Sequence, residues 1–155
     1  MNISYLQNHF INSEAMKLRE AFETYNFENA GQFSGIAQSL GYETEYRDGH
    51  FRFRKGDENI VMGVKEIRAR ASMIDDEPGR EASKERVAAF FDKDRANDPA
   101  YLKELEKEGV SIIRWENLKG EERDGFTIID HKNKVSYTGP VSYTHLRAHE
   151  TLANL

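Results

Sequence analysis

The chain of 155 residues contains no cysteine. This absence excludes disulfide bonds, zinc sites built on thiolates and cysteine nucleophiles. The chain also lacks any run of about eighteen apolar residues, the minimum for a membrane-spanning helix. Its first ten residues have neither the basic nor the apolar region of a secretory signal. These absences fit a reducing compartment and predict a cytoplasmic protein without a membrane partner.

Charge is abundant but unevenly distributed. Charged residues make up 32% of the chain, and an aromatic content of 11% is typical of a folded chain. The net charge of −5 argues against a dedicated nucleic-acid-binding protein, which is usually strongly basic. Residues 47–70, however, contain seven Lys or Arg against four Asp or Glu, whereas residues 75–108 contain seven against eleven. A basic face and an acidic face can therefore coexist.

The first half of the chain shows helical periodicity followed by strand-like alternation. Apolar residues recur at helical spacing in two segments, and Gly41 stands where a glycine ends the second. Side chains then alternate on both sides of Asp48-Gly49, a preferred two-residue hairpin turn. The predicted elements are helices over residues 13–25 and 29–40, and strands over residues 42–47, 50–54 and 59–64.

The second half of the chain is predicted to combine helices with a hairpin. Asp98-Pro99 is an N-cap followed by proline in the first turn, a typical helix start. Ser83 is a candidate cap for an earlier helix, and Asp75–Gly79 indicates a loop and a domain boundary. Residues 65–73 show an ambiguous pattern that leaves a short helix open. The predicted elements are helices over residues 83–93 and 99–108, a strand over 110–115, a polar loop over 117–124, and a hairpin of 126–130 with 135–138.

These elements predict an α+β fold, with N-terminal helices, a small antiparallel β-meander, further helices and a C-terminal hairpin. We expect a helical segment plus β-meander module over residues 1–78. A second α+β unit, truncated at its end, is expected over residues 79–139. Residues 140–155 are expected to be a non-native tail.

The expectation of a tail depends on residues 140–151, Pro-Val-Ser-Tyr-Thr-His-Leu-Arg-Ala-His-Glu-Thr. They resemble the translation of a transposase-type sequencing adapter, which implies that the native reading frame departs after about Gly139. The tail contains His145 and His149, and this i, i+4 spacing places two metal ligands on one face of a helix. Because adapter-derived residues are not selected for function, we expect no metal site there.

The other histidines and the acidic loop offer little chemistry. His9, His50 and His131 lie far apart and have no ligand spacing. His131 follows Asp130, but neighbouring strand residues point to opposite faces. Asp75-Asp76-Glu77 can hold a hard cation, although a solvated loop is the favoured interpretation. Phosphate-binding glycine motifs and nucleophile elbows are absent, so we expect no catalytic residue, no metal and no cofactor.

A basic stripe is the strongest functional candidate. Arg52 and Arg54 are predicted on the hairpin face opposite Phe51 and Phe53, and such arginines can follow a phosphate backbone. Aromatic rings that stay exposed can stack on bases. The favoured alternative is that the rings pack on the helices and the arginines are ordinary solvent-facing residues, and nearby acidic residues weaken the phosphate interpretation. The candidate nucleic-acid-binding residues are Arg47, Arg52, Arg54, Lys55, Arg68 and Arg70, and Lys65 lies in the same stripe.

Two stretches resemble proteins of mobile genetic elements. Residues 33–54, in which Leu40-Gly41-Tyr42 precedes the hairpin, look like a small module that follows the nuclease domain of mobilisation relaxases. Residues 124–139 are similar in character to accessory proteins of conjugative elements. Together they cover about a quarter of the chain. The histidine cluster and catalytic-tyrosine context of a relaxase nuclease are absent, so the resemblance carries over no catalytic residue and implies an accessory DNA-processing context.

Three functions remain open at this point. The favoured hypothesis is a non-catalytic nucleic-acid or protein-interaction module of a larger mobile-element protein. A second is an N-terminal fragment of an enzyme whose active site lies in a missing C-terminal part. A third is a structural protein-binding domain that uses the acidic helices between Glu81 and Glu108.

Overall fold

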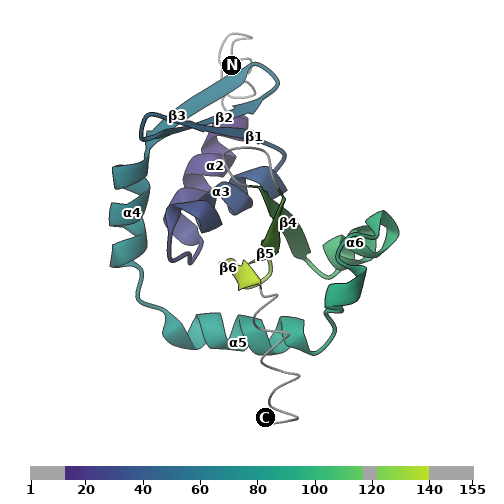
Figure 1. Ribbon diagram of the computed structural model, residues 1–155. Helices are drawn as coiled ribbons and strands as arrows, with labels where there is room; N and C mark the ends of the chain where they lie inside the picture. The colour runs from purple at the N-terminus through teal and green to yellow at the C-terminus, as the bar shows by residue number, and fades with distance from the viewer. Residues whose placement is uncertain (1–12, 117–121, 140–155) are drawn as a thin grey trace, which may run out of the picture. The chain divides into compact units, whose positions relative to one another are not determined.

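The computed structural model describes residues 13–116 and 122–139 (Figure 1). The chain divides into two compact units after Asp75, whereas the sequence predicted a boundary after residue 78. Each unit combines helices with a three-stranded antiparallel sheet. The predicted α+β class is therefore confirmed.

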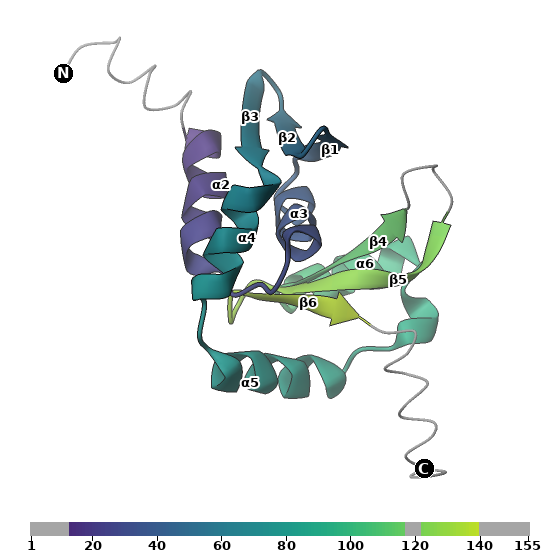
Figure 2. The ribbon, with the colours of Figure 1, turned by 60° about the vertical axis from the view of Figure 1, so that its left-hand side comes forward.

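The first unit consists of two helices, a β-meander and a further helix (Figure 2). The meander begins as a hairpin around Asp48-Gly49, whose φ angles of 50° and 78° suit a tight two-residue turn. Residues 65–73, whose sequence pattern is ambiguous, are helical. The elements are α2 (Ser13–Thr24), α3 (Ala30–Ser39), β1 (Glu43–Arg47), β2 (His50–Lys55), β3 (Glu58–Gly63) and α4 (Val64–Met73).

Aromatic rings form the core of the first unit. Phe33 of α3 is fully buried and lies 5.2–5.7 Å, between ring centroids, from Phe22, Phe27 and Phe53. Such pairs contribute about 0.5–1.5 kcal/mol each beyond the burial of their area. Because Phe53 is the buried residue of β2, this cluster attaches the sheet to the helices and fixes which face of the sheet meets solvent.

The second unit packs helices on a sheet ordered β4–β5–β6. Residues two apart along the strands enter one apolar cluster with residues of the helices, as expected for a sheet with one face on a core. The cluster contains Val87, Ala96, Tyr101, Leu105, Val110, Phe126, Ile128, Val135 and Tyr137. The elements are α5 (Glu77–Ala88), the 3₁₀ turn η1 (Lys93–Arg95), α6 (Pro99–Lys107), β4 (Val110–Glu116), β5 (Glu122–Asp130) and β6 (Val135–Gly139).

The start of the second unit corrects the sequence prediction. The residues predicted as a loop begin α5, because the Asp76 carboxylate accepts a hydrogen bond from the Gly79 N–H at 3.1 Å. Pro78 lies in the first turn, where a helix needs no N–H donor. Ser83 is not a cap: it lies inside α5 and is fully buried, and the helix ends at Ala88, earlier than predicted.

Three further outcomes concern the remaining predictions. β5 begins at Glu122, inside the segment predicted as a polar loop. In the described part of the chain, no helix has the length and apolar content to cross a membrane. The predicted tail, residues 140–155, lies outside the described residues.

Candidate functional site

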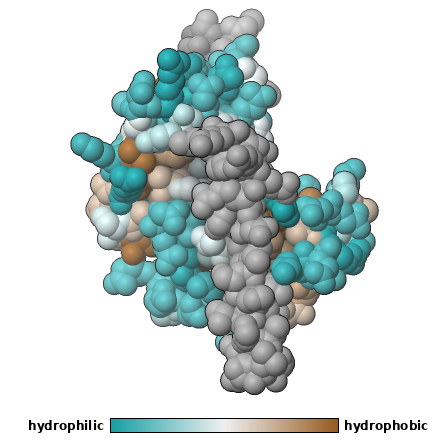
Figure 3. Space-filling view, viewed as in Figure 1, coloured by the Kyte–Doolittle hydropathy of each residue, from teal (hydrophilic) through white to brown (hydrophobic). Residues whose placement is uncertain are grey.

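The outward face of the first unit's sheet gathers the charged residues of the hairpin. Alternate residues of a strand share a face, and the strand register places residues of β1 and β2 directly opposite one another. The surface over this sheet is hydrophilic (Figure 3). The face is formed by the cross-strand pairs Glu43–Arg54, Glu45–Arg52 and Arg47–His50, with Asn59 and Val61 of β3 beside them, and all eight residues are exposed.

The aromatic residues of the meander lie on the opposite face. Phe53 is fully buried against Phe33, and Phe51 stacks beside Phe53 with 5.8 Å between ring centroids. Tyr46 packs 4.9 Å from Phe51 and keeps 42% of its surface exposed. The arginine-bearing face, as far as it is described, therefore presents mostly charged groups and the His50 imidazole, without a Phe, Tyr or Trp ring for base stacking.

Arg54 and Arg47 lie in loose ion pairs on this face. Arg54 Nη2 is 3.8 Å from Glu43 Oε2, and Arg47 Nε is 3.8 Å from Asp48 Oδ2. All four side chains are at least half exposed. Pairs of this kind are worth about 0–1 kcal/mol. The arginines can therefore leave these acids at little cost, although the acids reduce the positive potential around them.

Two of the six candidate nucleic-acid-binding residues, Lys55 and Arg70, have structural roles instead. Lys55 Nζ donates to the Leu40 carbonyl at the end of α3 at 2.9 Å, and lies 5.6 Å from the centre of the Tyr42 ring. Arg70 donates from Nε to the Phe22 carbonyl at 3.0 Å and from Nη2 to the Glu23 carbonyl at 2.5 Å, at the end of α2.

These two contacts follow from how α2 and α3 end. Neither helix carries a basic residue in its own last turn. The last carbonyls of a helix have no partner within the helix and attract cations. Lys55 from β2 and Arg70 from α4 supply those cations, so their ammonium and guanidinium groups are engaged inside the unit.

Three cations remain available. Arg52, Lys65 and Arg68 are exposed and form no ion pair or hydrogen bond within the described part of the chain. Lys65 and Arg68 are three apart on α4 and so share a face of that helix. The Val64 N–H donates to the Gly49 carbonyl at 2.8 Å, so α4 begins directly at the β1–β2 turn. The arginine face and the start of α4 are therefore neighbouring surfaces.

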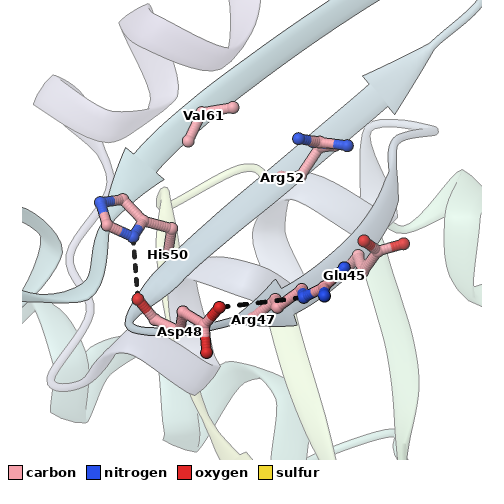
Figure 4. Close-up of a pocket in the computed structure, with 6 residues that line it drawn as sticks. All are labelled: Glu45, Arg47, Asp48, His50, Arg52 and Val61. Carbon is pink, nitrogen blue, oxygen red and sulfur yellow. Dashed lines mark hydrogen bonds and ion pairs between the residues drawn. The ribbon is translucent and has the colours of Figure 1, made fainter.

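A hollow of about 270 Å³ lies on the outward face. Its lining alternates in charge, with Arg47 and Arg52 interleaved with Glu45 and Asp48 (Figure 4). His50 Nδ1 lies 3.0 Å from the Asp48 carbonyl oxygen, and Val61 completes the lining. The groups at this hollow are hydrogen-bond donors and acceptors of both signs of charge.

The second unit contains a charge network that the sequence analysis missed. Asp130, at the end of β5, is fully buried. Its carboxylate accepts hydrogen bonds from Arg86 Nη2 at 2.7 Å and from the Ser83 hydroxyl at 2.7 Å, both on α5. It also accepts from the backbone N–H groups of Lys132 and Asn133, at 3.1 and 3.2 Å, and from Asn133 Nδ2 at 2.8 Å.

These contacts determine the protonation of Asp130. Burial raises the pKa of Asp130, but the hydrogen bonds from Arg86, Ser83 and Asn133 outweigh it, so the pKa is lowered. The same pairing raises the pKa of Arg86, which also donates to the Glu108 carbonyl at 3.1 Å. A carboxylate held by so many donors ties α5 to the β5–β6 turn and is unsuited to act as a general base.

His131 lies apart from this network despite following Asp130 in sequence. Its Nε2 is 3.1 Å from the Ser111 hydroxyl on β4, whereas the Asp130 side chain contacts α5. Burial lowers the pKa of His131, and the nearby Asp130 charge opposes this shift without cancelling it. The two residues engage different partners, as the alternation of strand residues predicts.

Among the described residues, the other candidate ligands do not form a metal site. Within residues 13–116 and 122–139, no group of three or more His, Asp or Glu side chains is arranged to hold a metal ion. Asp76, from the acidic segment for which a solvated loop was favoured over a cation site, caps α5. His9, His145 and His149 lie outside the described residues.

No protein-family model, curated protein or solved structure matches the chain significantly. The functional argument therefore depends on the residues of the surface itself.

Proposed function

We propose that this chain is a non-catalytic interaction module whose outward sheet face, together with the start of α4, contacts the phosphate backbone of a nucleic acid. The observation that carries the proposal is the set of three exposed cations, Arg52, Lys65 and Arg68, without a partner in the described part of the chain. Arg47 and Arg54 stand beside them in pairs that open at little cost.

The number of cations sets the strength of the interaction. Each phosphate neutralised on double-stranded DNA contributes about −0.9 to the slope of log K against log salt concentration, so three contacts give a slope of roughly −2.7. The neighbouring Glu43, Glu45 and Asp48 and the net charge of −5 lower the affinity further. We therefore expect weak, sequence-independent binding, suited to a module that assists a larger DNA-binding protein.

The resemblance of residues 33–54 to a relaxase-associated module supports this context. That stretch contains most of α3 and all but the last residue of the β1–β2 hairpin, and hence Arg47, Arg52 and Arg54. We propose that the module belongs to a mobile-element protein and assists DNA processing there.

Fluorescence anisotropy with labelled single- and double-stranded DNA tests the proposal. The triple variant Arg52→Ala, Lys65→Ala, Arg68→Ala is expected to lose at least about tenfold in affinity at low salt and most of the salt dependence. The matched control replaces Lys103, Lys107 and Lys132, three exposed lysines of the second unit, by alanine. Absence of binding by the wild-type chain at low salt, or equal loss in the two triple variants, contradicts the proposal.

A protein partner is the second candidate, favoured by the alternating signs of charge on the face. Glu43 faces Arg54 and Glu45 faces Arg52 across the strands, a pattern that complements a surface of mixed charge. Exchanging Glu45 and Arg52 (Glu45→Arg with Arg52→Glu) keeps the net charge and reverses the pattern. A polyanion is expected to respond weakly to this exchange, whereas a protein partner is expected to be lost in co-purification.

A further inference from the structure

β3 is an edge strand of the first unit's sheet, and its centre carries no charge. The order β1–β2–β3 leaves one side of β3 without a neighbouring strand among the described residues. Its central residues are Asn59, Ile60, Val61 and Met62, and Val61 is 52% exposed. The opposite edge strand, β1, carries three charged side chains among its five residues. Charges of this kind protect an edge from pairing with another chain, so β1 is protected and β3 is open to pairing.

The backbone groups of Val61 point to this open edge. The Val64 N–H donates to the Gly49 carbonyl at 2.8 Å, and this bond lies next to the facing pair of His50 and Gly63. In an antiparallel ladder, a pair flanked in this way is a non-hydrogen-bonded pair, and pairs of the two kinds alternate. Val61, two residues before Gly63, therefore forms a pair of the same kind with its partner on β2. Its N–H and C=O groups consequently face away from β2, where a further strand can bond them.

We propose that β3 pairs antiparallel with β3 of a second copy of the chain, in a symmetric dimer centred on Val61. In this register the two Val61 residues face each other and exchange two backbone hydrogen bonds, and Ile60 lies opposite Met62 of the second copy. Apolar side chains therefore meet apolar side chains on both faces of the joined sheet, which stabilises the pairing. Centring the pairing on Ile60 instead would place Glu58 opposite Met62, a charge against an apolar side chain.

The surface beside the edge also suits a second copy. A hollow of about 250 Å³ lies between β3 and the helices α2 and α4 (Figure 2), and its lining includes Leu18 and Phe22. The charged side chains of its lining are exposed and form no ion pair within the described residues: Arg19, Glu23 and Glu66. A two-fold axis brings this surface of one copy against the same surface of the other. Because the surface carries both signs of charge, opposite charges can pair across the axis.

The pairing joins two three-stranded sheets into one sheet of six strands. A two-fold axis perpendicular to the sheet keeps the outward faces of the two copies on the same side. The Arg52 side chains of both copies then lie on one continuous surface. The pairing itself needs no nucleic acid, so it can fail while the DNA contact holds, and the reverse.

Sedimentation velocity of the full chain without DNA, over a series of protein concentrations, measures the self-association. We expect a dimer in the wild-type chain. Val61→Lys is expected to weaken dimerisation at least about tenfold, because two like charges then face each other at the centre of the pairing. The control is Glu45→Gln, which makes the same change in net charge at an exposed position of the opposite edge strand.

Three results of that experiment overturn the proposal. The first is a wild-type chain that stays monomeric up to about 1 mM. The second is a dimer that Val61→Lys leaves intact, with far-ultraviolet circular dichroism unchanged, because the contact then lies elsewhere. The third is equal weakening by Val61→Lys and Glu45→Gln.

The absence of cysteine allows the register to be tested directly. Facing residues of a hydrogen-bonded pair have Cα atoms about 5.5 Å apart, within the roughly 4.4–6.8 Å that a disulfide bond requires. With oxidised glutathione, Val61→Cys is therefore expected to give at least about fivefold more disulfide-linked dimer than Glu45→Cys at the same protein concentration. Equal yields in the two variants contradict pairing centred on Val61.

Discussion

The two units use the same residue types in opposite ways. In the second unit, Arg86 Nη2 lies 2.7 Å from Oδ1 of the buried Asp130. Ser83 and Asn133 donate further hydrogen bonds to the same carboxylate. In the first unit, Arg54 stands 3.8 Å from Glu43 with both side chains at least half in solvent. The comparison shows that two properties decide the role of an arginine beside an acid. If the acid is buried and accepts further hydrogen bonds, the arginine is fixed in the structure; if both side chains are exposed, the arginine can bind a partner.

The same contrast occurs within one helix. Arg68 and Arg70 are two residues apart on α4, yet Arg68 is exposed and Arg70 donates to two carbonyls at the end of α2. Substituting one or the other of these two arginines therefore compares a structural cation with an exposed one, in the same residue type and on the same helix.

The largest effect is expected at Asp130. Asp130→Ala removes the carboxylate to which Arg86 and Ser83 donate, and breaking a buried ion pair by removing one partner costs about 3–5 kcal/mol. Urea denaturation of the full chain measures the loss, with Glu43→Ala as the exposed control, expected to cost no more than about 0.5 kcal/mol. Similar losses in the two variants would remove the contrast between the units.

The lowered pKa of Asp130 gives this stabilisation a pH dependence. A carboxylate with a lowered folded pKa contributes its stability above its unfolded pKa of about 3.9, and the contribution is lost as the pH falls from there through the folded pKa. The wild-type chain is therefore expected to lose free energy of unfolding below about pH 4, and Asp130→Ala to lose less over that range.

An intermediate effect is expected at Arg70. Arg70→Ala removes the two hydrogen bonds to the Phe22 and Glu23 carbonyls, and we expect it to cost about 1–2 kcal/mol. Arg68→Ala is the matched control on the same helix, expected to change stability by no more than about 0.5 kcal/mol. Thermal denaturation compares the two, and a larger loss for Arg68→Ala would show that the structural and available roles are reversed.

A smaller effect is expected at His131, whose pKa is lowered by burial. Between the unfolded pKa of about 6.5 and the lower folded pKa, the unfolded chain binds a proton at this histidine and the folded chain does not. The free energy of unfolding therefore decreases as the pH is lowered through this range, and the decrease ends below the folded pKa. His131→Gln is expected to flatten this dependence between about pH 7 and 5. His50→Gln is the control. A dependence that persists unchanged in His131→Gln contradicts the assignment.

The sequence predicted best what depends on neighbouring residues. The Asp48-Gly49 hairpin, the cap at Asp98 and the sharing of a face by Arg52 and Arg54 follow from local turn chemistry and alternation. The start of α5 was missed because Asp75–Gly79, an acidic run that ends in Pro-Gly, was interpreted as a loop. An aspartate followed by a proline in the first turn also suits a helix start, and the local pattern does not decide between the two.

The roles of Lys55, Arg70 and Asp130 were beyond local reasoning. Lys55 reaches a carbonyl 15 residues away, Arg70 reaches carbonyls 47 and 48 residues away, and Asp130 meets Arg86 across 44 residues. These contacts exist only once the elements pack. The one local signal for the Asp130 network was an aspartate at a strand end with Asn133 in the turn that follows, a pattern typical of side chain to backbone bonding.

The most direct test of the proposed interface removes its acids. In Glu43→Gln with Glu45→Gln the outward face loses two negative charges, while the three available cations stay in place. If this face contacts a phosphate backbone, affinity for DNA at low salt should rise by about three- to tenfold, with a steeper salt dependence. The rise cannot come from misfolding, which only weakens binding at a folded surface. Unchanged affinity in this variant would show that DNA does not bind at this face.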